Sequence, residues 1–423
     1  MGDIKDIQWN ISQRIYLRFI FLYLLFYIYP YGFEYIQELN TRDISFWPGI
    51  TTWFGETFLG WEFDKENLLN GFDSKYDYSR FILIALLSVI GTSIWLFIDA
   101  KIKRDYNARL NILIKTILRY HIGLTLIIYG LSKVLMLQFG EMDFNRLETT
   151  MGNQTGMSFL WAFMSYSKFY TMSTGWIELI GGILLLFRKS TFIGAFILFI
   201  AMANVVLIDI GYDVRVKMFA IHLFLMTLIL LGDNLKRLYR FFILNTTTKP
   251  VEQQALFSNP KAKKIGYSLK GILLLYFVTS SVIIYTDRSA KRTNRYPTVA
   301  GFHTVEMMIK NNDTISEIND QRWKNLSISG SSYRPETAVI REVSGRRNSY
   351  SFEADTLKKT MILYSIRGNR KAELKLKYKE LNHQEFIFEG THQSDSIWIK
   401  TTSKTLKDYP LTANEIRWIT DLR

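Results

Sequence analysis

Long apolar stretches separated by short charged segments occupy the first two thirds of the 423-residue chain. About 20 apolar residues are enough to cross a bilayer as a helix. A further apolar run, Met157–Tyr166, predicts an interfacial or re-entrant helix, or the start of a long fourth span. The pattern therefore predicts an α-helical membrane bundle of about seven transmembrane helices. Their approximate limits are Arg14–Phe33, Arg80–Asp99, Asn111–Lys133, Thr171–Phe187, Thr191–Asp209, Arg215–Leu231 and Tyr267–Tyr285.

The pattern changes at about Thr286, where apolar and polar residues begin to alternate. Alternation with a period of two, interrupted by turn-forming residues, is typical of β-strands. Regularly spaced short strands favour a β-sandwich or a small barrel, so we predict an all-β soluble C-terminal domain. The expected strands are Thr304–Ile309, Trp323–Ile328, Ala338–Val343, Ser349–Phe352, Thr360–Ile366, Ala372–Tyr378, Glu385–Glu389 and Ser396–Lys400.

Basic residues concentrate in the segments Ala100–Leu110, Arg188–Lys189 and Gly232–Gly266. The loop Glu34–Ser79 is instead acidic and contains several tryptophans, and the residues around Trp53 predict a short helix at the outer interface. Because basic loops tend to remain in the cytoplasm, we predict a multi-pass protein of the bacterial inner membrane. Its N-terminus would be cytoplasmic, and its C-terminal domain periplasmic.

The amino-acid composition excludes several kinds of site and partner. The chain contains no cysteine, which excludes disulfides, iron–sulfur clusters and thiolate metal sites. Its net charge of +14 is divided between the membrane flanks and the tail, without the basic helix or stacking motif that nucleic-acid binding needs. The three histidines of the tail, His303, His383 and His392, are scattered. We therefore expect no metal site and no nucleic-acid partner, and we interpret the tail as a binding module.

Five regions follow from these observations. A two-span region with an acidic, Trp-rich external loop occupies residues 1–110, and a four-helix core occupies residues 111–235. A cytoplasmic linker at 236–266, a seventh transmembrane helix at 267–285 and the periplasmic β-rich domain at 286–423 complete the chain.

The third and fourth predicted spans carry charged residues at membrane depth, where charge is costly and usually functional. Lys133 lies near the end of the third span and Glu178 near the start of the fourth, so both fall in the outer half of the membrane and can meet. Each span also has a stripe of small residues at helical spacing, which lets helices approach closely in lipid. The helix-packing glycines are Gly123, Gly130, Gly175, Gly181 and Gly182.

Further polar residues cluster at the turn between the fifth and sixth predicted spans. Together with the third and fourth spans, they predict a polar chamber that opens outward, in which Lys133 and Glu178 are candidate catalytic residues. A purely structural pair and a hydrated turn are the alternative interpretation. The candidate binding residues are Arg119, Tyr129, Asn204, Asp209, Asp213, Arg215, Lys217 and His222.

The order of these residues resembles the DoxX-like family of four-helix membrane proteins. The resemblance covers about residues 112–232, and the longer layout is similar to that of DoxX-like proteins of Bacteroidota. It implies a four-helix core, with some members serving as subunits of thiosulfate:quinone oxidoreductases or of membrane oxidoreductase complexes. The additional N-terminal spans and the tail depart from the short family pattern. The matching motifs are Arg119…Gly123…Tyr129-Gly130…Lys133 and Gly175…Glu178…Gly181-Gly182…Leu185…Arg188.

Two functional hypotheses follow. In the first, the protein is a subunit of a membrane redox system, with a cavity for a quinone or a small anion and a partner that carries the electrons. In the second, it is a non-enzymatic envelope anchor whose β-rich tail docks a periplasmic partner or lipid-linked cargo. Membrane lipids are expected partners in both cases. A b-type haem held by His121 and His222, kinship to vitamin K-dependent carboxylases, and transport are weaker alternatives.

Overall fold

The computed structural model divides the chain into two compact units, which are described separately. The first comprises Met1–Leu131 and Thr174–Leu273, and the second comprises Ser132–Ser173 and Leu274–Arg423. The residues whose structure is described are 9–29, 46–64, 68, 72–102, 106–248, 259–292, 299–329, 336–366, 372–392 and 394–413.

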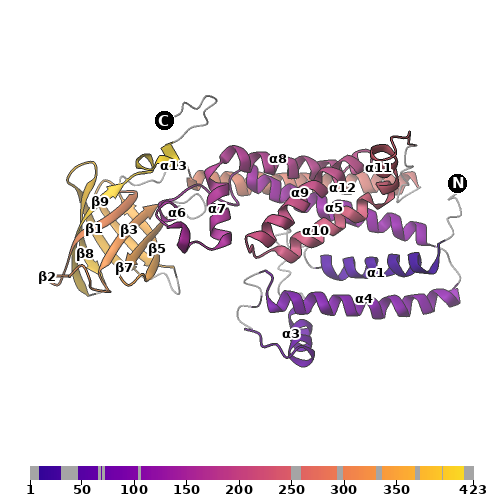
Figure 1. Ribbon diagram of the computed structural model, residues 1–423, viewed down its shortest axis with the longest axis horizontal. Coiled ribbons are helices and arrows are strands. Elements are labelled where there is room, and N and C mark those ends of the chain that lie inside the picture. Colours follow the sequence, from indigo (N-terminus) through magenta and orange to yellow (C-terminus); the bar gives the residue numbers. More distant parts are fainter. Residues whose placement is uncertain are drawn as a thin grey trace. The chain divides into compact units, whose positions relative to one another are not determined.

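Helices form most of the first unit (Figure 1). Six helices in the described part of the chain are long and apolar enough to cross a membrane: Ile11–Ile28, Lys75–Ile102, Asn107–Val134, Arg188–Gly211, Lys217–Phe242 and Pro260–Ile284. These confirm six of the seven predicted spans. The helices are α1 (Ile11–Ile28), α3 (Trp47–Phe58), α4 (Lys75–Ile102), α5 (Asn107–Val134), α8 (Lys168–Leu185), α9 (Thr191–Gly211), α10 (Lys217–Leu231), α11 (Leu235–Phe242) and α12 (Pro260–Arg292).

The fourth predicted span coincides with α8, which is helical but is not among the six. Lys168, Glu178 and several hydroxyl-bearing residues lower its hydropathy. The small residues of α8 nevertheless lie against α5, itself a candidate span. The part of α8 from Thr174 onward therefore belongs to the helical unit, where protein contacts replace part of the lipid contact that a more apolar helix would make.

Residues at the start of α1 explain where this first helix begins. Asn10 caps α1, because its side chain accepts a hydrogen bond from the backbone of Gln13, whose own side chain accepts from the backbone of Asn10. Helices α1 and α4 lie side by side (Figure 1). Apolar residues of α1, α5, α9 and α10, among them Leu24, Leu118 and Leu198, form a common buried core. Burial of these apolar side chains stabilises the packing of the four helices against one another.

The acidic loop between α1 and α4 contains the short helix that the sequence predicts around Trp53. Helix α3 contains Trp53, which is 56% exposed, and Trp47, which is buried and donates a hydrogen bond to the Tyr29 carbonyl. Trp47 and Phe54 pack with Leu83 of α4. Helix α3 is thus attached to the bundle through one face and leaves an aromatic side chain on the other.

The second unit contains a closed antiparallel barrel, as the β-strand labels in Figure 1 show. All eight predicted strands are present, and the only additional strand in the described part of the chain is the two-residue β2. The strands are β1 (Gly301–Lys310), β2 (Asp313–Thr314), β3 (Trp323–Ser329), β4 (Thr337–Glu342), β5 (Arg347–Asp355), β6 (Thr360–Ser365), β7 (Ala372–Glu380), β8 (Glu385–His392) and β9 (Asp395–Lys404).

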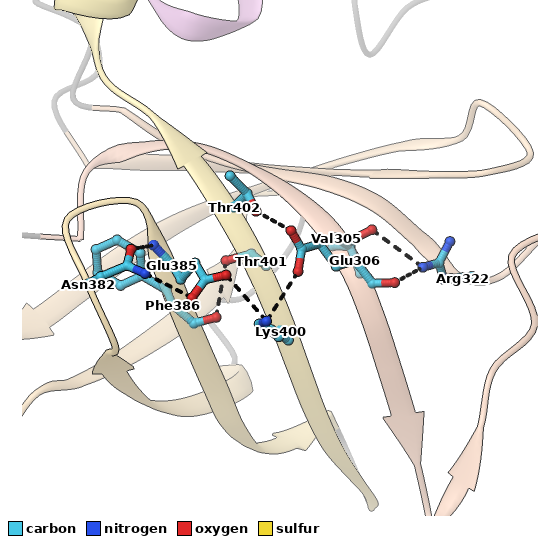
Figure 2. Close-up of polar contacts among 9 residues, drawn as sticks. All are labelled: Val305, Glu306, Arg322, Asn382, Glu385, Phe386, Lys400, Thr401 and Thr402. Carbon is cyan, nitrogen blue, oxygen red and sulfur yellow. Dashed lines mark hydrogen bonds and ion pairs between the residues drawn. The ribbon is translucent and has the colours of Figure 1, made fainter.

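Pairing of the first strand with the last decides between the predicted sandwich and barrel. Strand β1 pairs with β3 on one side and with β9 on the other, so eight strands close into a ring. A bulge interrupts β1 between Val305 and Met307. The buried guanidinium of Arg322 donates to the carbonyls of Val305 and Glu306, at 3.4 and 2.7 Å, and so satisfies acceptors beside the bulge (Figure 2). Bulges raise local twist, which helps closure.

Side chains fill the interior of the barrel. The buried cluster includes Phe352, Leu363, Leu376, Phe388 and Ile399 from five successive strands. An eight-stranded barrel is just wide enough for side chains to fill it. On the outer face, Lys400 lies between Glu306 and Glu385, with nitrogen–oxygen distances of 3.6 and 3.3 Å (Figure 2). This ion-pair network links strands β1, β9 and β8.

His303 makes the stability of the barrel sensitive to acid. Burial lowers the pKa of His303 to about 4, while its Nε2–H donates to the Val299 carbonyl and its ring meets Phe386 and Phe388 edge-on. Histidine in the unfolded chain has a pKa near 6.5 and therefore binds the proton first as the pH falls. The barrel should lose about 3 kcal/mol of stability between pH 6.5 and pH 4.

Urea titrations at several pH values measure this loss. Because the chain has no cysteine, a fluorophore on Lys324→Cys, an exposed position of β3, reports barrel unfolding. His303→Leu should remove most of the pH dependence in this window, whatever its effect at pH 7. An equally steep acid loss in His303→Leu would show that other groups are responsible.

Candidate functional site

Small residues bring α5 and α8 into backbone contact. A Cβ atom on Gly130 would lie 2.6 Å from the Leu179 nitrogen and 2.7 Å from the Gly175 oxygen. One on Gly182 would lie 2.8 Å from the Gly123 oxygen. Gly181 faces another neighbour, Leu198 of α9, whose side chain would be 2.5 Å from an added Cβ. The glycines thus set the spacing of three helices.

Arg119 caps the C-terminal end of α8. Its Nε donates to the Leu185 carbonyl at 3.0 Å, and Lys270 of α12 donates from Nζ to the Leu186 carbonyl at 2.5 Å. The last carbonyls of a helix have no partner within the helix, and cations complement the negative end of its dipole. The structure therefore assigns a capping contact to Arg119, which the sequence pattern placed among binding residues.

Lys133 and Glu178 are both buried, at 7% and 3% exposure. Lys133 ends α5 and belongs to the second unit, whereas Glu178 is in the part of α8 that belongs to the first unit. Their meeting therefore stays a prediction. Asp209 of α9 and Asp77 of α4 are also buried, so the described part of the first unit encloses three buried acidic residues.

The remaining predicted binding residues differ in burial and in their contacts. Tyr129 packs against Phe219, with ring centroids 6.0 Å apart. Asn204 and Arg215 are exposed. That these residues line one chamber with Lys133 and Glu178 stays a prediction.

Lys217 forms its own polar group at the start of α10. Its Nζ donates to Asp213 at 2.7 Å and lies 3.8 Å from Asp73. The Asp73 carboxylate also accepts from the backbone nitrogens of Lys217 and Met218, at 2.7 and 3.1 Å. Asp73, from the loop between α3 and α4, thereby caps α10, a contact that the large separation in sequence hides.

His222 lies in an aromatic cluster of the first unit. Its Nδ1 donates to the Met218 carbonyl at 2.6 Å, which leaves Nε2 to accept from the Tyr23 hydroxyl at 2.7 Å. Its ring stacks on Tyr27, with centroids 4.3 Å apart, and Phe81 lies 4.9 Å away. Both ring nitrogens are engaged, so His222 has no lone pair left for a metal.

His121 contacts the same tyrosine. The centroid of its ring is 6.4 Å from that of Tyr27, at an interplanar angle of 88°. Tyr27 thus contacts both histidines. With both nitrogens of His222 in hydrogen bonds, the geometry disfavours the bis-histidine haem hypothesis.

Two buried arginines that the sequence pattern did not single out also have structural partners. Arg18 pairs with Asp99 at 2.5 Å and donates to the Asn107 side chain at 2.8 Å. Arg80 donates to the Tyr29 carbonyl at 2.7 Å, just beyond the end of α1. Their partners are 51 to 89 residues away in the chain, a range over which spacing rules carry no information.

In the second unit, one end of the barrel is attached to the segment between α5 and α8. This segment contains α6 (Phe144–Leu147) and α7 (Gly156–Tyr166), and α6 contacts β1 and β3. Glu148 accepts hydrogen bonds from Tyr409 and Lys404, at 2.7 and 3.2 Å. Burial and the adjacent Glu148 carboxylate raise the pKa of Tyr409 above its usual value, which keeps its hydroxyl a donor. We call this end the docked end.

The opposite end of the barrel carries a ring of polar side chains, which we call the polar rim. At this end, Trp323 of β3 pairs with Glu342 of β4, and His392 of β8 pairs with Asp395 of β9. The other ends of these strands lie at the docked end. Asn348 donates to Glu342 at 3.0 Å, and Lys310 pairs with Asp395 at 2.8 Å. The polar rim comprises Lys310, Glu342, Asn348, Tyr350, Glu373, His392 and Asp395.

Electrostatics link the members of the polar rim. Burial, then Glu373 and Glu342, raise the pKa of Tyr350 to about 12. Burial, then Lys310, lower the pKa of His392 despite three nearby carboxylates. Near neutral pH the rim therefore presents a neutral phenol and a neutral imidazole between carboxylates and an ammonium group. Sequence spacing missed this set because its members come from different strands and meet only when the barrel closes.

Comparison with known proteins gives two matches. The family model named DoxX matches residues 114–209. The uncharacterized protein YwoB of Bacillus subtilis (strain 168) is 32% identical over 124 residues, which is 29% of this chain and 79% of that protein. No solved structure matches the chain. The family model matches the helical part of the chain and does not reach the barrel.

Proposed function

Because the chain belongs to the DoxX family, a family of membrane proteins, we propose that it is a membrane-anchored binding protein whose barrel recognises a partner through its polar rim. The observation that carries this proposal is the difference between the two ends of the barrel. One end is held by Glu148, Lys404 and Tyr409, and the other exposes donors and acceptors from several strands.

The packed interior limits what the barrel can bind. Phe352 and Leu363 belong to a continuous buried cluster beneath the rim, and Tyr350 of the rim is part of the same cluster. An apolar ligand held inside would have to displace this core, at a cost of several kcal/mol. A polar surface group of a partner needs no such rearrangement. We therefore propose docking at the rim, with the helical unit as anchor.

The location of the barrel is part of the proposal. Basic segments at Ala100–Leu110 and Gly232–Gly266 favour a cytoplasmic N-terminus in the bacterial inner membrane. The barrel would then face the periplasm, and its partner would be a periplasmic protein or the exposed part of another envelope component. Nucleic acid would not be a partner.

Site-specific photo-crosslinking in the native membrane tests the proposal. A photoreactive amino acid at Ser344, in the turn that joins β4 to β5 at the rim, should capture the partner. The control position for crosslinking is Leu357, which is 94% exposed and lies in the turn that joins β5 to β6 at the docked end. Glu342→Gln with Glu373→Gln should reduce capture at Ser344 by roughly tenfold, the loss expected from about 1.4 kcal/mol.

Glu389→Gln is the control, because Glu389 is exposed on the outer face of β8. Equal capture at Ser344 and Leu357, or capture at Ser344 that the rim variants leave unchanged, would contradict recognition by the rim.

A second candidate function rests on the helical unit. Glu178 and Asp209 are buried there, and Tyr23 and His222 form a hydrogen-bonded pair. Buried ionisable groups in membranes often bind ions or relay protons. In this alternative the protein is a redox subunit that holds a quinone or a small anion through Lys133 and Glu178, with electrons supplied by a partner. Failure of the crosslinking experiment, together with a quinone in lipid extracts of the purified protein, would favour it.

A further inference from the structure

The helix that follows α10 is strongly amphipathic. At about 100° per residue, Leu235, Leu238, Tyr239 and Phe242 of α11 fall within about 100° of arc, and its basic residues fall on the other side. Leu235, Tyr239 and Phe242 are exposed. Such a helix is suited to lie at a boundary between an apolar and a polar phase.

The position of α11 along the chain places this boundary at the end of a membrane span. The candidate span Lys217–Phe242 contains α10 and α11 and has 26 residues. As a helix it would be about 39 Å long, whereas the hydrocarbon core is about 30 Å thick. The last residues of the span, which are those of α11, therefore reach the lipid headgroups.

A groove lies along α11. Its volume is about 340 Å³, and it is lined by Leu235, Lys236, Tyr239, Arg240 and Leu244. The chain turns back after the helix at Asn245, which has a φ of 49°, and the Thr246 nitrogen donates to the Arg240 carbonyl at 3.0 Å. This turn holds Leu244 beside the helix and forms one wall of the groove.

Three cations of α11 differ in what they contact. Arg237 donates to the Asn234 side chain at 3.3 Å and lies over the Phe192 ring, so it fastens α11 to the bundle. Lys236 and Arg240 are exposed, are one helical turn apart and line the groove. Within the described part of the chain, neither of these two side chains has an acidic partner. Two positive charges thus line the groove and can hold an anionic ligand.

We propose that this groove binds the headgroup of an anionic phospholipid. Lys236 and Arg240 would hold the phosphate, the Tyr239 hydroxyl would donate to the headgroup, and Leu235 and Leu244 would contact the start of the acyl chains. Charge complementarity, the volume of the groove and its place at the end of a span all fit this occupant. Each cation at an anionic membrane surface contributes about 1 kcal/mol, so two should favour such a lipid by roughly tenfold or more.

Native mass spectrometry of the full-length protein in mild detergent tests the assignment. The probes are phosphatidylglycerol, phosphatidylcholine and inorganic phosphate, each added separately. The wild type should retain phosphatidylglycerol roughly tenfold better than phosphatidylcholine. Lys236→Gln with Arg240→Gln should abolish that preference. The matched control, Lys261→Gln with Lys263→Gln, removes two exposed cations at the start of α12 and should keep it.

Each contrary outcome is informative. Equal retention of the two lipids by the wild type would overturn the proposal, as would an equal loss of preference in the control variant. Phosphate adducts that exclude phosphatidylglycerol would show that the site recognises free phosphate. Circular dichroism melts verify that the groove variant is folded, and Tyr239→Phe, which removes only the hydroxyl, should weaken retention without changing the melt.

Discussion

Replacing Asp99 with alanine should destabilise the helical unit by about 4 kcal/mol, because it leaves a buried guanidinium without its counter-ion. Arg18 is only 2% exposed and is 2.5 Å from the Asp99 carboxylate. Its guanidinium also lies over the rings of Trp95 and Tyr106, at 5.8 and 5.5 Å from their centroids. These rings cannot replace a full negative charge. Unfolding by sodium dodecyl sulfate, followed by circular dichroism, measures the loss.

A double variant distinguishes the desolvated charge from loss of packing. Arg18→Met with Asp99→Leu removes both charges and keeps apolar volume, so it should recover most of the stability that Asp99→Ala loses. The control is Glu141→Gln, which breaks the exposed ion pair between Lys168 and Glu141. Exposed pairs contribute at most about 1 kcal/mol, so this variant should resemble the wild type. A double variant as unstable as Asp99→Ala would exclude the charge explanation.

Replacing Gly130 with leucine should prevent α5 and α8 from packing and abolish the folded helical unit. Even a Cβ at this position would lie 2.6 Å from a backbone nitrogen and 2.7 Å from a backbone oxygen of α8. Backbone atoms cannot move aside as the end of a flexible side chain can, so the two helices would have to separate. Overpacking alone typically costs 1–3 kcal/mol, and a leucine here adds lost helix contact to that cost.

The yield of monodisperse protein from detergent and its thermal unfolding are the measurements for Gly130→Leu. Gly211→Leu is the matched control, since nothing lies within 4 Å of a Cβ at that position. Gly123→Ala should give an intermediate result, because its Cβ would be 3.1 Å from the Gly182 oxygen. A Gly130→Leu protein as stable as Gly211→Leu would show that α5 and α8 do not depend on this contact.

Much of the secondary structure follows from periodicity. All eight expected strands of the tail are present, because alternation between a packed interior and an outer face is imposed on every strand of a barrel. The six apolar spans are likewise evident, since the bilayer sets their length. The two-residue β2 is too short to alternate, and α8 lies below the expected hydropathy because it contains Lys168, Glu178 and several hydroxyl-bearing residues.

Site residues were harder to predict, since a buried charge in a membrane has several uses that look alike in sequence. Arg119 has the spacing of a cavity residue, yet its Nε lies 3.0 Å from the Leu185 carbonyl and caps α8. His222 is a predicted chamber residue, and its contacts with Tyr23 and Tyr27 of α1 are ones that the sequence did not indicate. Helix-wheel spacing shows which face a residue occupies, not which helix lies opposite.

Local pattern was therefore sufficient for the helical and β-rich halves, for the membrane spans and for the motif that marks the DoxX core, since each depends on residues close together in the chain. Tertiary structure alone decided that the tail is a closed barrel, because β1 and β9 are about ninety residues apart and their pairing is a long-range contact. It also decided that the buried Arg119 caps a helix, whereas the exposed Lys236 and Arg240 line a groove, because those contacts depend on segments that meet only after folding.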